Sequence, residues 1–453
     1  MSGYQCPPPS SPPAAPTPNE QWNLTSTIPF QGIVGTGNAY VYYAVGHSSL
    51  VNPLIISEGF PGGQSLDHLW ATFNNSGFAT SLLSLGYDVI FLGYPAPGAV
   101  GVPTYIEANS GVAIACIQQA ISQAPANAQL VVGGASMGGL VTRYALAYME
   151  TNNMPHNTLL YFSFDTPHLG ATIPASVLYF VNYFYTAEPA TVQSVYNLLQ
   201  SPAAQEMLLY WLPPGTSSTP TVSSYRTQFL QNLINVGNFP KLPYKRIGVA
   251  NGNGIGSPNA TQPASLAFSW TYDQTFKGHS VQEASASLYS APGGTAGVIP
   301  KPNTVCKLAA ASSPDFFRWN YQVPPSPTPD VTFDNAPGGR GDYFCILYDT
   351  LVSMQGSNPS VAFGQSCFIP TISALAMSTL DPTNEKDLYT NISQNPQPSL
   401  LDAYTYSSSP QSDPHVTFTP QLAGWLYQQI LENGPIMWQE HHGGGEGGVK
   451  HNA

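Results

Sequence analysis

One stretch of this sequence places a serine among the small neighbours that an exposed nucleophile requires. Residues 134–138 read Gly-Ala-Ser-Met-Gly, the pattern G-x-S-x-G, between an apolar run at Leu130–Gly133 and a segment of helical spacing at Leu140–Glu150. A sharp turn from strand to helix presents a serine hydroxyl at the edge of a sheet, and only small residues tolerate so close an approach of the backbone. The context therefore predicts that Ser136 is a nucleophile.

A serine nucleophile needs a base that takes its proton, and in this kind of site the base follows the serine in the chain. The sequence has nine histidines. His415 lies in a loop just before the last predicted helix, Pro420–Leu431, where the base is expected to enter the site. His168 follows a predicted strand directly, which suits a structural hydrogen-bonding role better. We predict His415 as the general base, with His168 as the alternative.

The acid that would orient this histidine has several candidates. The usual position, the loop after the predicted strand Tyr244–Ala250, reads NGNGIGSPNATQ and holds no carboxylate. Asp165 ends the preceding predicted strand, Leu159–Phe164, and is the preferred candidate. Its alternative role is to hydrogen-bond the turn that follows it. Further candidates are Asp334, Asp381 and Asp402.

Two backbone N–H groups are expected to bind the negative charge that develops on the substrate oxygen. One belongs to Met137, the residue after the nucleophile. The other is expected at Phe60, in the turn Glu58-Gly59-Phe60 that follows the apolar run Pro53–Ser57. An ordinary strand exit is the alternative interpretation of this turn.

Short apolar runs alternate with segments of helical spacing in the first half of the chain. This alternation predicts a mostly parallel central sheet with helices on both faces. The runs are Pro53–Ser57, Tyr87–Leu92, Leu130–Gly133 and Leu159–Phe164, and the helical segments are Leu66–Leu85, Tyr105–Gln123 and Leu140–Glu150.

The predicted catalytic domain, residues 21–435, lies between two flexible ends. Residues 1–20 form a Pro-rich linker that is predicted to be disordered, and residues 436–453 form a flexible Gly/His tail. Within the domain, residues 173–242 are rich in aromatic and Leu residues at helical spacing and predict a helical cap. Residues 265–365 predict a β-rich insertion with few helix signals. The cap would serve as a lid or an acyl-binding wall, or would be a solvent-facing subdomain with its own core.

Several of these segments resemble a known family. Residues 135–146 (ASMGGLVTRYAL) and 164–171 (FDTPHLGA) look like those of α/β-hydrolase lipases, and residues 58–60 and 85–89 fit the same family. The resemblance covers about residues 50–172 and is strongest to bacterial lipase-like proteins related to GPI inositol-deacylase. It implies the α/β-hydrolase fold and hydrolysis of acyl esters without a metal or an organic cofactor. Residues 368–375 also resemble the stretch that follows the catalytic Asp-Gly of lipases, but Gln-Ser-Cys stands in that position here.

The composition restricts the partners and the compartment. Lys and Arg number 12 against 24 Asp and Glu, and only 8% of residues are charged, where a soluble domain typically has about 25%. So few cations exclude nucleic-acid binding, and no apolar run is long enough for a transmembrane segment. This composition is typical of secreted proteins, although no signal peptide is visible. Of the five cysteines, Cys306, Cys345 and Cys367 could supply one disulfide, with small buried thiols as the alternative.

The sequence therefore predicts a secreted serine carboxylesterase or lipase whose partner is an apolar ester or a lipid substrate. One alternative is an acyl hydrolase that acts on polymeric esters, thioesters or amides. The other is a catalytically silent binding or adhesion protein with a hydrolase-like fold, because the customary acid position is empty of carboxylates.

Overall fold

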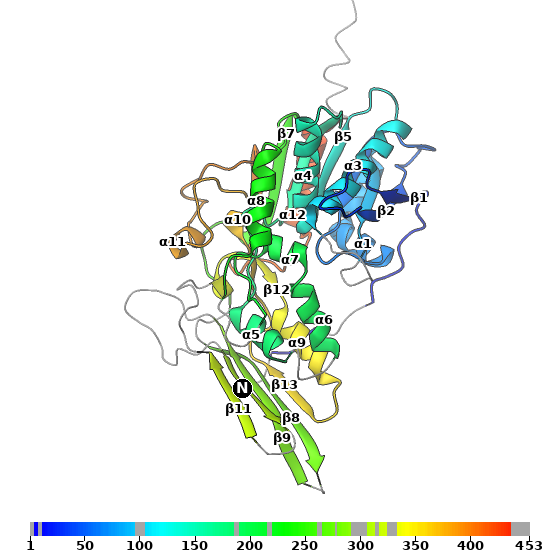
Figure 1. The fold of residues 1–453 in the computed structure, drawn as a ribbon. Coiled ribbons are helices and arrows are strands. Elements are labelled where there is room, and N and C mark those ends of the chain that lie inside the picture. The colour runs from blue at the N-terminus through cyan, green and yellow to red at the C-terminus, as the bar shows by residue number, and fades with distance from the viewer. Residues whose placement is uncertain are drawn as a thin grey trace, which may run out of the picture.

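A computed structural model describes residues 4–7, 11–95, 105–184, 190–214, 220–260, 265–276, 279–290, 306–312, 317–323 and 333–435. The predicted tail, residues 436–453, lies outside these residues. An eight-stranded sheet forms the upper part of the molecule in Figure 1, and a five-stranded sheet forms its lower end. A two-stranded ribbon, β12 (Gly338–Gly341) and β14 (Ser366–Pro370), lies near the junction of the two parts.

The eight-stranded sheet has the order β1-β2-β4-β3-β5-β6-β7-β15. The strands from β4 to β15 are parallel to one another, and β2 runs antiparallel between β4 and β1. The bounds are β1 Glu20–Thr25, β2 Thr36–Tyr42, β3 Pro53–Ser57, β4 Asp88–Gly93, β5 Leu130–Ala135, β6 Thr158–Phe164, β7 Lys245–Asn253 and β15 Ala403–Ser407. Every residue of β3, β4, β5 and β6 is buried, which explains why these strands read as unbroken apolar runs.

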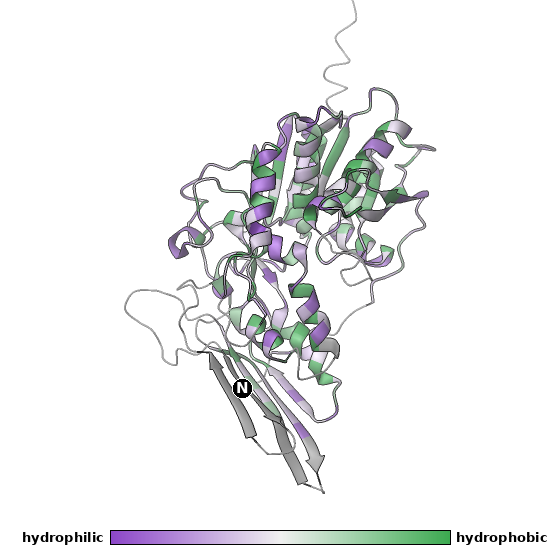
Figure 2. Cartoon of the chain, viewed as in Figure 1, coloured by the Kyte–Doolittle hydropathy of each residue, from purple (hydrophilic) through white to green (hydrophobic). Residues whose placement is uncertain are grey.

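Helices cover both faces of this sheet, and side chains alternate between the two layers. Ile55 packs with one layer, while Leu54 and Ile56 pack with the other. The first layer contains α3 (Ile106–Gln123), α4 (Met137–Thr151), α7 (Pro202–Met207) and α8 (Ser224–Asn235), and the second contains α1 (Leu66–Phe73), α2 (Phe78–Leu85) and α12 (Pro420–Asn433). Figure 2 shows the central strands mostly in the green of hydrophobic residues. The strand order and the two helical layers confirm the predicted α/β-hydrolase fold.

The second part of the molecule is an antiparallel sheet of the order β11-β10-β9-β8-β13. Three helices pack against it around Phe180, Phe268 and Trp270. The bounds are α5 Ala175–Phe184, α6 Ala190–Leu199, α9 Tyr343–Val352, β8 Leu266–Phe276, β9 His279–Tyr289, β10 Cys306–Ser312, β11 Phe317–Val323 and β13 Ser357–Val361. Two short helices, α10 (Thr371–Ala374) and α11 (Glu385–Leu388), follow β14.

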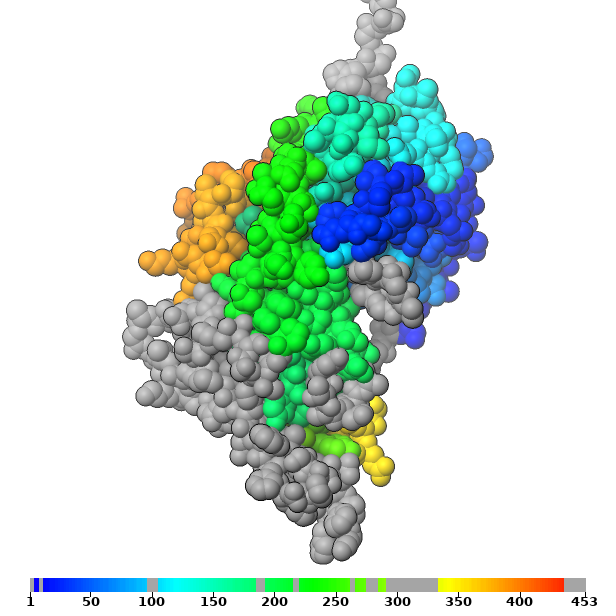
Figure 3. Space-filling view, viewed as in Figure 1, coloured from blue at the N-terminus to red at the C-terminus, as the bar shows by residue number. Residues whose placement is uncertain are grey.

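The helices of the predicted cap therefore belong to two different cores. α5 and α6 pack with the five-stranded sheet, whereas α7 and α8 pack with α3 and α4 of the main sheet. In Figure 3 the green residues of this segment form the middle of the viewed face, between the blue N-terminal strands and the orange segment after β14. Among its described residues, the predicted β-rich insertion also contains the α-helix α9, whose run of apolar residues is short and lies between glycine-containing segments.

Part of the segment predicted as a Pro-rich linker contacts the domain. The Ala15 N–H donates to the Asp67 carboxylate at 2.8 Å, and the Tyr42 hydroxyl donates to the Pro16 carbonyl at 2.9 Å. An extended Pro-rich chain has no internal hydrogen bonds, so its backbone groups are free to pair with the side chains of the domain surface.

A disulfide joins Cys6 to Cys345 in α9, across 339 positions of the chain. The expectation of a pair among the three C-terminal cysteines is therefore wrong for Cys345, because the Pro-rich segment brings a partner from the other end of the sequence. Cys116 and Cys367 are buried free thiols. The side chain of Cys306 lies outside the described residues.

Candidate active site

The turn between β5 and α4 has the strained geometry that the G-x-S-x-G motif predicts. Ser136 adopts φ 54° and ψ −127°, a conformation that residues with a side chain rarely adopt. A β carbon on Gly134 would lie 2.4 Å from the carbonyl carbon of Gly138, and one on Gly138 would lie 2.2 Å from the carbonyl oxygen of Ser57. Both glycines are required because any side chain would collide with the neighbouring backbone.

The structure brings Ser136, His415 and Asp165 into one hydrogen-bonded chain. Nε2 of His415 lies 2.8 Å from Oγ of Ser136, and Nδ1 of His415 lies 2.6 Å from Oδ2 of Asp165. With the proton on Nδ1, the imidazole donates to the carboxylate and presents Nε2 as an acceptor for the serine proton. This is the arrangement in which a histidine acts as general base and a carboxylate fixes its tautomer.

The Asp165 carboxylate is fully buried, with 0% of the residue exposed. Its other oxygen, Oδ1, accepts the backbone N–H of Asn251 at 3.0 Å. Asn251 belongs to the end of β7, where the customary acid would be. The β7 end therefore supports the acid with a backbone donor, a role that nothing in its sequence indicated.

The β12–β14 ribbon lies against the acid and the base. A β carbon on Gly339 would lie 1.9 Å from Oδ2 of Asp165, and the Arg340 carbonyl accepts the backbone N–H of His415 at 2.8 Å. The Phe368 ring stands edge-on to the imidazole at 4.8 Å between centroids, and Tyr343 packs on Phe368 at 5.5 Å. No sequence motif indicated a role for these residues in the site, but the glycine pair at 338–339 is a signal for it, since glycine in a strand marks close backbone approach.

Of the two residues predicted for the oxyanion site, Met137 directly follows the nucleophile in the chain, and Phe60 directly follows Gly59, which lies against it. Met137 is the first residue of α4, so its N–H has no carbonyl partner one turn earlier in the helix. A β carbon on Gly59 would lie 2.9 Å from the Ser136 β carbon. The loop that continues into Phe60 therefore passes directly over the serine.

His168, the alternative base, occupies a different environment. Its Nε2 lies 3.0 Å from the Ser163 hydroxyl and its Nδ1 lies 3.3 Å from the Arg143 guanidinium. Complete burial, followed by the Arg143 charge, holds the pKa of His168 well below its ordinary value. A neutral, buried imidazole with these partners fits the structural role that the sequence analysis assigned to it.

The alternative acids are engaged elsewhere. Asp402 forms an ion pair with Arg246 at 2.7 Å, and Asp381 accepts the N–H and the hydroxyl of Thr383. Asp334 is buried in a short 3-10 helix, Phe333–Asn335. Of the four candidates, Asp165 is the one that the structure brings to His415.

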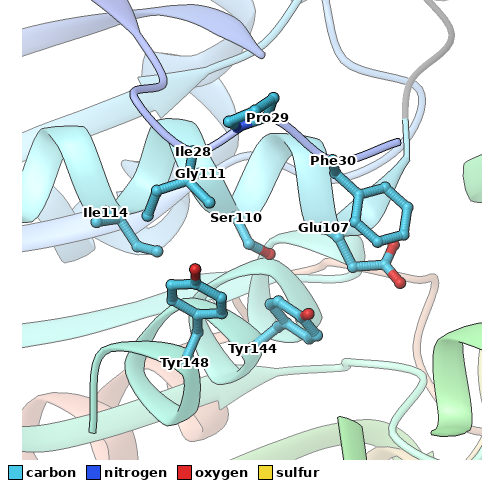
Figure 4. A pocket seen from close by; sticks show the side chains of 9 residues that line it. All are labelled: Ile28, Pro29, Phe30, Glu107, Ser110, Gly111, Ile114, Tyr144 and Tyr148. Atoms are coloured by element: carbon cyan, nitrogen blue, oxygen red, sulfur yellow. The ribbon is translucent and has the colours of Figure 1, made fainter. Parts of the chain in front are cut away.

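A small cavity of about 100 Å³ lies away from these residues, between α3, α4 and the connection from β1 to β2. Figure 4 shows the Tyr144 and Tyr148 rings of α4 facing Ser110 of α3, with Phe30 and Glu107 at the other end. Neither Ser136 nor His415 lines it. Within the described ranges, no cluster of three His, Cys, Asp or Glu side chains is arranged to hold a metal ion, and no helix has the length and hydropathy to cross a membrane.

Ser136 stands at a strand–turn–helix elbow, which is the arrangement of the nucleophile in serine hydrolases. A family model described as "Putative serine esterase (DUF676)" matches residues 111–244. This range contains Ser136, Met137 and Asp165 and ends before His415. No curated protein matches the chain.

Solved structures with similar folds include lipases and esterases. A lipase of Bacillus licheniformis is 14% identical, with 52% of this chain and 74% of that chain covered and a TM-score of 0.29. An esterase of Pyrobaculum calidifontis is 11% identical, with 51% and 66% covered and a TM-score of 0.30. A brefeldin A esterase, described as a bacterial homologue of human hormone-sensitive lipase, is 13% identical, with 42% and 51% covered and a TM-score of 0.26.

Proposed function

We propose that this protein hydrolyses carboxylic esters of apolar acyl groups through a triad of Ser136, His415 and Asp165. The observation that carries the proposal is the pair of contacts made by the His415 imidazole, one with the Ser136 hydroxyl and one with the Asp165 carboxylate. Each partner is of the type that general-base activation of a serine requires.

In the proposed reaction, Oγ of Ser136 attacks the ester carbonyl carbon while its proton moves to Nε2 of His415. The N–H groups of Met137 and Phe60 stabilise the negative charge on the carbonyl oxygen. His415 then gives the proton to the leaving alcohol, and the acyl group remains on Ser136. A water molecule, deprotonated by His415, attacks the acyl-enzyme and releases the carboxylic acid and the free serine.

Apolar surroundings of the base support an apolar substrate. The Phe368 ring contacts the imidazole of His415, and Tyr343 extends the same aromatic surface. The net charge of −12, with 12 cationic side chains in the sequence, gives little attraction for anionic headgroups. These features favour fatty acyl chains over charged acyl groups.

Secretion is part of the proposal. Disulfides form and persist in oxidising compartments, and the Cys6–Cys345 bond supports export of the chain.

The structure removes the main reason for the alternative hypothesis of a catalytically silent binding protein. That hypothesis depended on the missing carboxylate after β7, and the contact of Asp165 with His415 provides a carboxylate from β6 instead. The alternative substrates, which are polymeric esters, thioesters and amides, are distinguished from simple esters by a substrate panel.

The test combines a covalent probe with a panel of substrates. The wild-type chain is expected to be labelled by a fluorophosphonate at Ser136 and to hydrolyse p-nitrophenyl esters, with a preference for longer acyl chains. Ser136→Ala should abolish both labelling and hydrolysis. An active Ser136→Ala variant, or a folded wild-type chain that is neither labelled nor active on esters, a thioester, an anilide or a polyester film, would overturn the proposal.

A further inference from the structure

A second carboxylate is buried at the start of the loop that passes over the nucleophile, and it takes no part in the proposed triad. Glu58 is 1% exposed and directly precedes Gly59 and Phe60. Its Oε1 accepts the backbone N–H of Tyr94, just after β4, and that of Gly63 at 3.3 Å. Its Oε2 accepts the N–H of Gln64 at 3.4 Å. One side chain thus fastens both ends of the loop over Ser136 to the neighbouring strand.

The surrounding backbone is shaped to hold this carboxylate. A β carbon on Gly93 would lie 3.3 Å from Oε1 of Glu58, so the absence of a side chain there leaves room for the carboxyl group. The Tyr94 hydroxyl lies 2.7 Å from the hydroxyl of Ser57, and the Tyr94 carbonyl accepts the Gly63 N–H at 2.6 Å. The end of β4 therefore holds the loop at three points.

A carboxylate is a costly choice for this position. Burial raises the pKa of Glu58 from 4.5 to about 7, and the three N–H donors oppose that rise without cancelling it. The charged form is disfavoured in the folded protein because burial removes its water. A neutral side chain at this position would avoid the desolvation free energy of the carboxylate. A purely structural role therefore does not explain well why residue 58 is a glutamate.

We propose that Glu58 is the positioning residue of the oxyanion loop: its carboxylate fixes the Tyr94, Gly63 and Gln64 backbone and thereby holds the Phe60 N–H in place for the transition state. The proposal depends on the proposed esterase function. Donors that are fixed in advance stabilise developing charge without having to reorganise during the reaction. Phe60 lies between the segment over Ser136 and the two N–H groups that the carboxylate holds, so a loose loop would displace its donor.

The same sheet provides a matched control at its opposite end. Asp88, the first residue of β4, is also fully buried and accepts the backbone N–H groups of Ala44 at 2.8 Å, Val51 at 2.6 Å and Asn52 at 2.8 Å. Like Glu58 it accepts three backbone N–H groups, and it also contacts Nδ1 of His47 at 2.9 Å, but it fastens the loops at the end of β4 away from Tyr94. Asp88 should therefore affect stability and leave catalysis unchanged.

The experiment compares Glu58→Gln, Glu58→Leu and Asp88→Asn in the full chain. We expect kcat for a p-nitrophenyl ester to fall about 10-fold in Glu58→Gln and about 100-fold in Glu58→Leu, with KM nearly unchanged, because one oxyanion donor is worth about 10²–10³ in kcat. Affinity for a boronic acid transition-state analogue should fall in parallel. Asp88→Asn should keep the wild-type kcat and analogue affinity while its urea midpoint falls.

The pH profile gives a readout that does not depend on variant stability. The groups that face the Glu58 carboxyl are the three backbone N–H donors and the Tyr94 phenol, which remains neutral because burial raises its pKa well above 10. Protonation of Glu58 below about pH 7 should loosen the loop, so the wild-type kcat profile should contain an acid-side step that Glu58→Gln lacks. If Glu58→Leu does not fold, Glu58→Gln and this profile decide the question.

Two outcomes would overturn the inference while the proposed function stands. One is a Glu58→Gln variant with wild-type kcat, analogue affinity and pH profile, in a chain whose Ser136 is labelled by fluorophosphonate. The other is a Glu58→Gln variant that loses stability as Asp88→Asn does, with unchanged kcat. Failure of the esterase function itself would show differently, as an unlabelled wild-type serine.

Discussion

Nδ1 of His415 lies 2.6 Å from Oδ2 of Asp165, although the two residues are 250 positions apart in the chain. The carboxylate comes from the end of β6, one strand nearer to the nucleophile than the customary loop after β7. The β7 end takes part through the backbone N–H of Asn251, which binds the other carboxylate oxygen. The acid therefore lies one strand away from its customary position, and the hydrogen bonds that link Ser136, His415 and the acid are still formed.

Replacing the acid tests this relationship directly. Asp165→Asn should lower kcat on p-nitrophenyl esters by about 10³–10⁴-fold, because an amide favours the wrong tautomer of the histidine. Asp381→Asn and Asp402→Asn should retain wild-type kcat, since those side chains contact Thr383 and Arg246. A normal kcat for Asp165→Asn, or a comparable loss in either control, would contradict the assignment.

The glycine over the acid gives a steric prediction. In Gly339→Ala the new β carbon would lie 1.9 Å from Oδ2 of Asp165, so the carboxylate or the ribbon must move and kcat should fall at least about 10-fold, the effect of about 1.4 kcal/mol. Gly424 lies in α12 with no atom within 4 Å of the equivalent position. Gly424→Ala should therefore keep full activity and raise the free energy of unfolding by about 0.5–1 kcal/mol. Parallel kinetics and urea denaturation check both variants, and equal behaviour of the two alanines would refute the steric argument.

The disulfide should contribute measurably to stability. Because it closes a very long loop, Cys345→Ser should lower the free energy of unfolding by about 2–4 kcal/mol. A reducing agent should destabilise the wild-type chain and have no further effect on Cys345→Ser, since Cys116 and Cys367 are free thiols. Urea curves with and without reductant measure this, and identical curves for the wild type would show that the bond contributes nothing.

Glu58 should also make stability depend on pH in a definite direction. Its pKa is raised from 4.5 to about 7 in the folded state, so the folded protein binds this proton more tightly than the unfolded chain does. The resulting stabilisation, about 3 kcal/mol, is complete below pH 4.5 and is lost as pH rises through 7. The stability of Glu58→Gln relative to wild type should therefore increase between pH 4.5 and 7. A difference that stays constant with pH would exclude the raised pKa.

The features that the sequence predicted well are local ones. The apolar runs of β3 to β6 are visible because helices bury both faces of the sheet, and the serine motif is visible because its two glycines flank the serine at a fixed spacing within one short segment. His415 was found by its place before α12. In each case neighbours in sequence carry the physical reason.

The features that were missed depend on contacts between distant segments. The support of Asp165 by Asn251 and the packing of Gly339 on the same carboxylate depend on how β7 and β12 meet, which no local pattern encodes. The division of the cap helices between two cores likewise depends on the five-stranded sheet. The pairing of Cys6 needed the path of the Pro-rich segment over the domain.

The order of the cysteines along the chain has a consequence for production of the protein. Cys116 and Cys306 are synthesised between Cys6 and its partner Cys345. If the cysteines were oxidised in the order in which they are synthesised, Cys6 would therefore pair with the wrong thiol. Rearrangement to the native disulfide requires thiol–disulfide exchange, which is slow without a catalyst. The yield of correctly paired chain should depend on a disulfide isomerase in the expression host more than on oxidising strength.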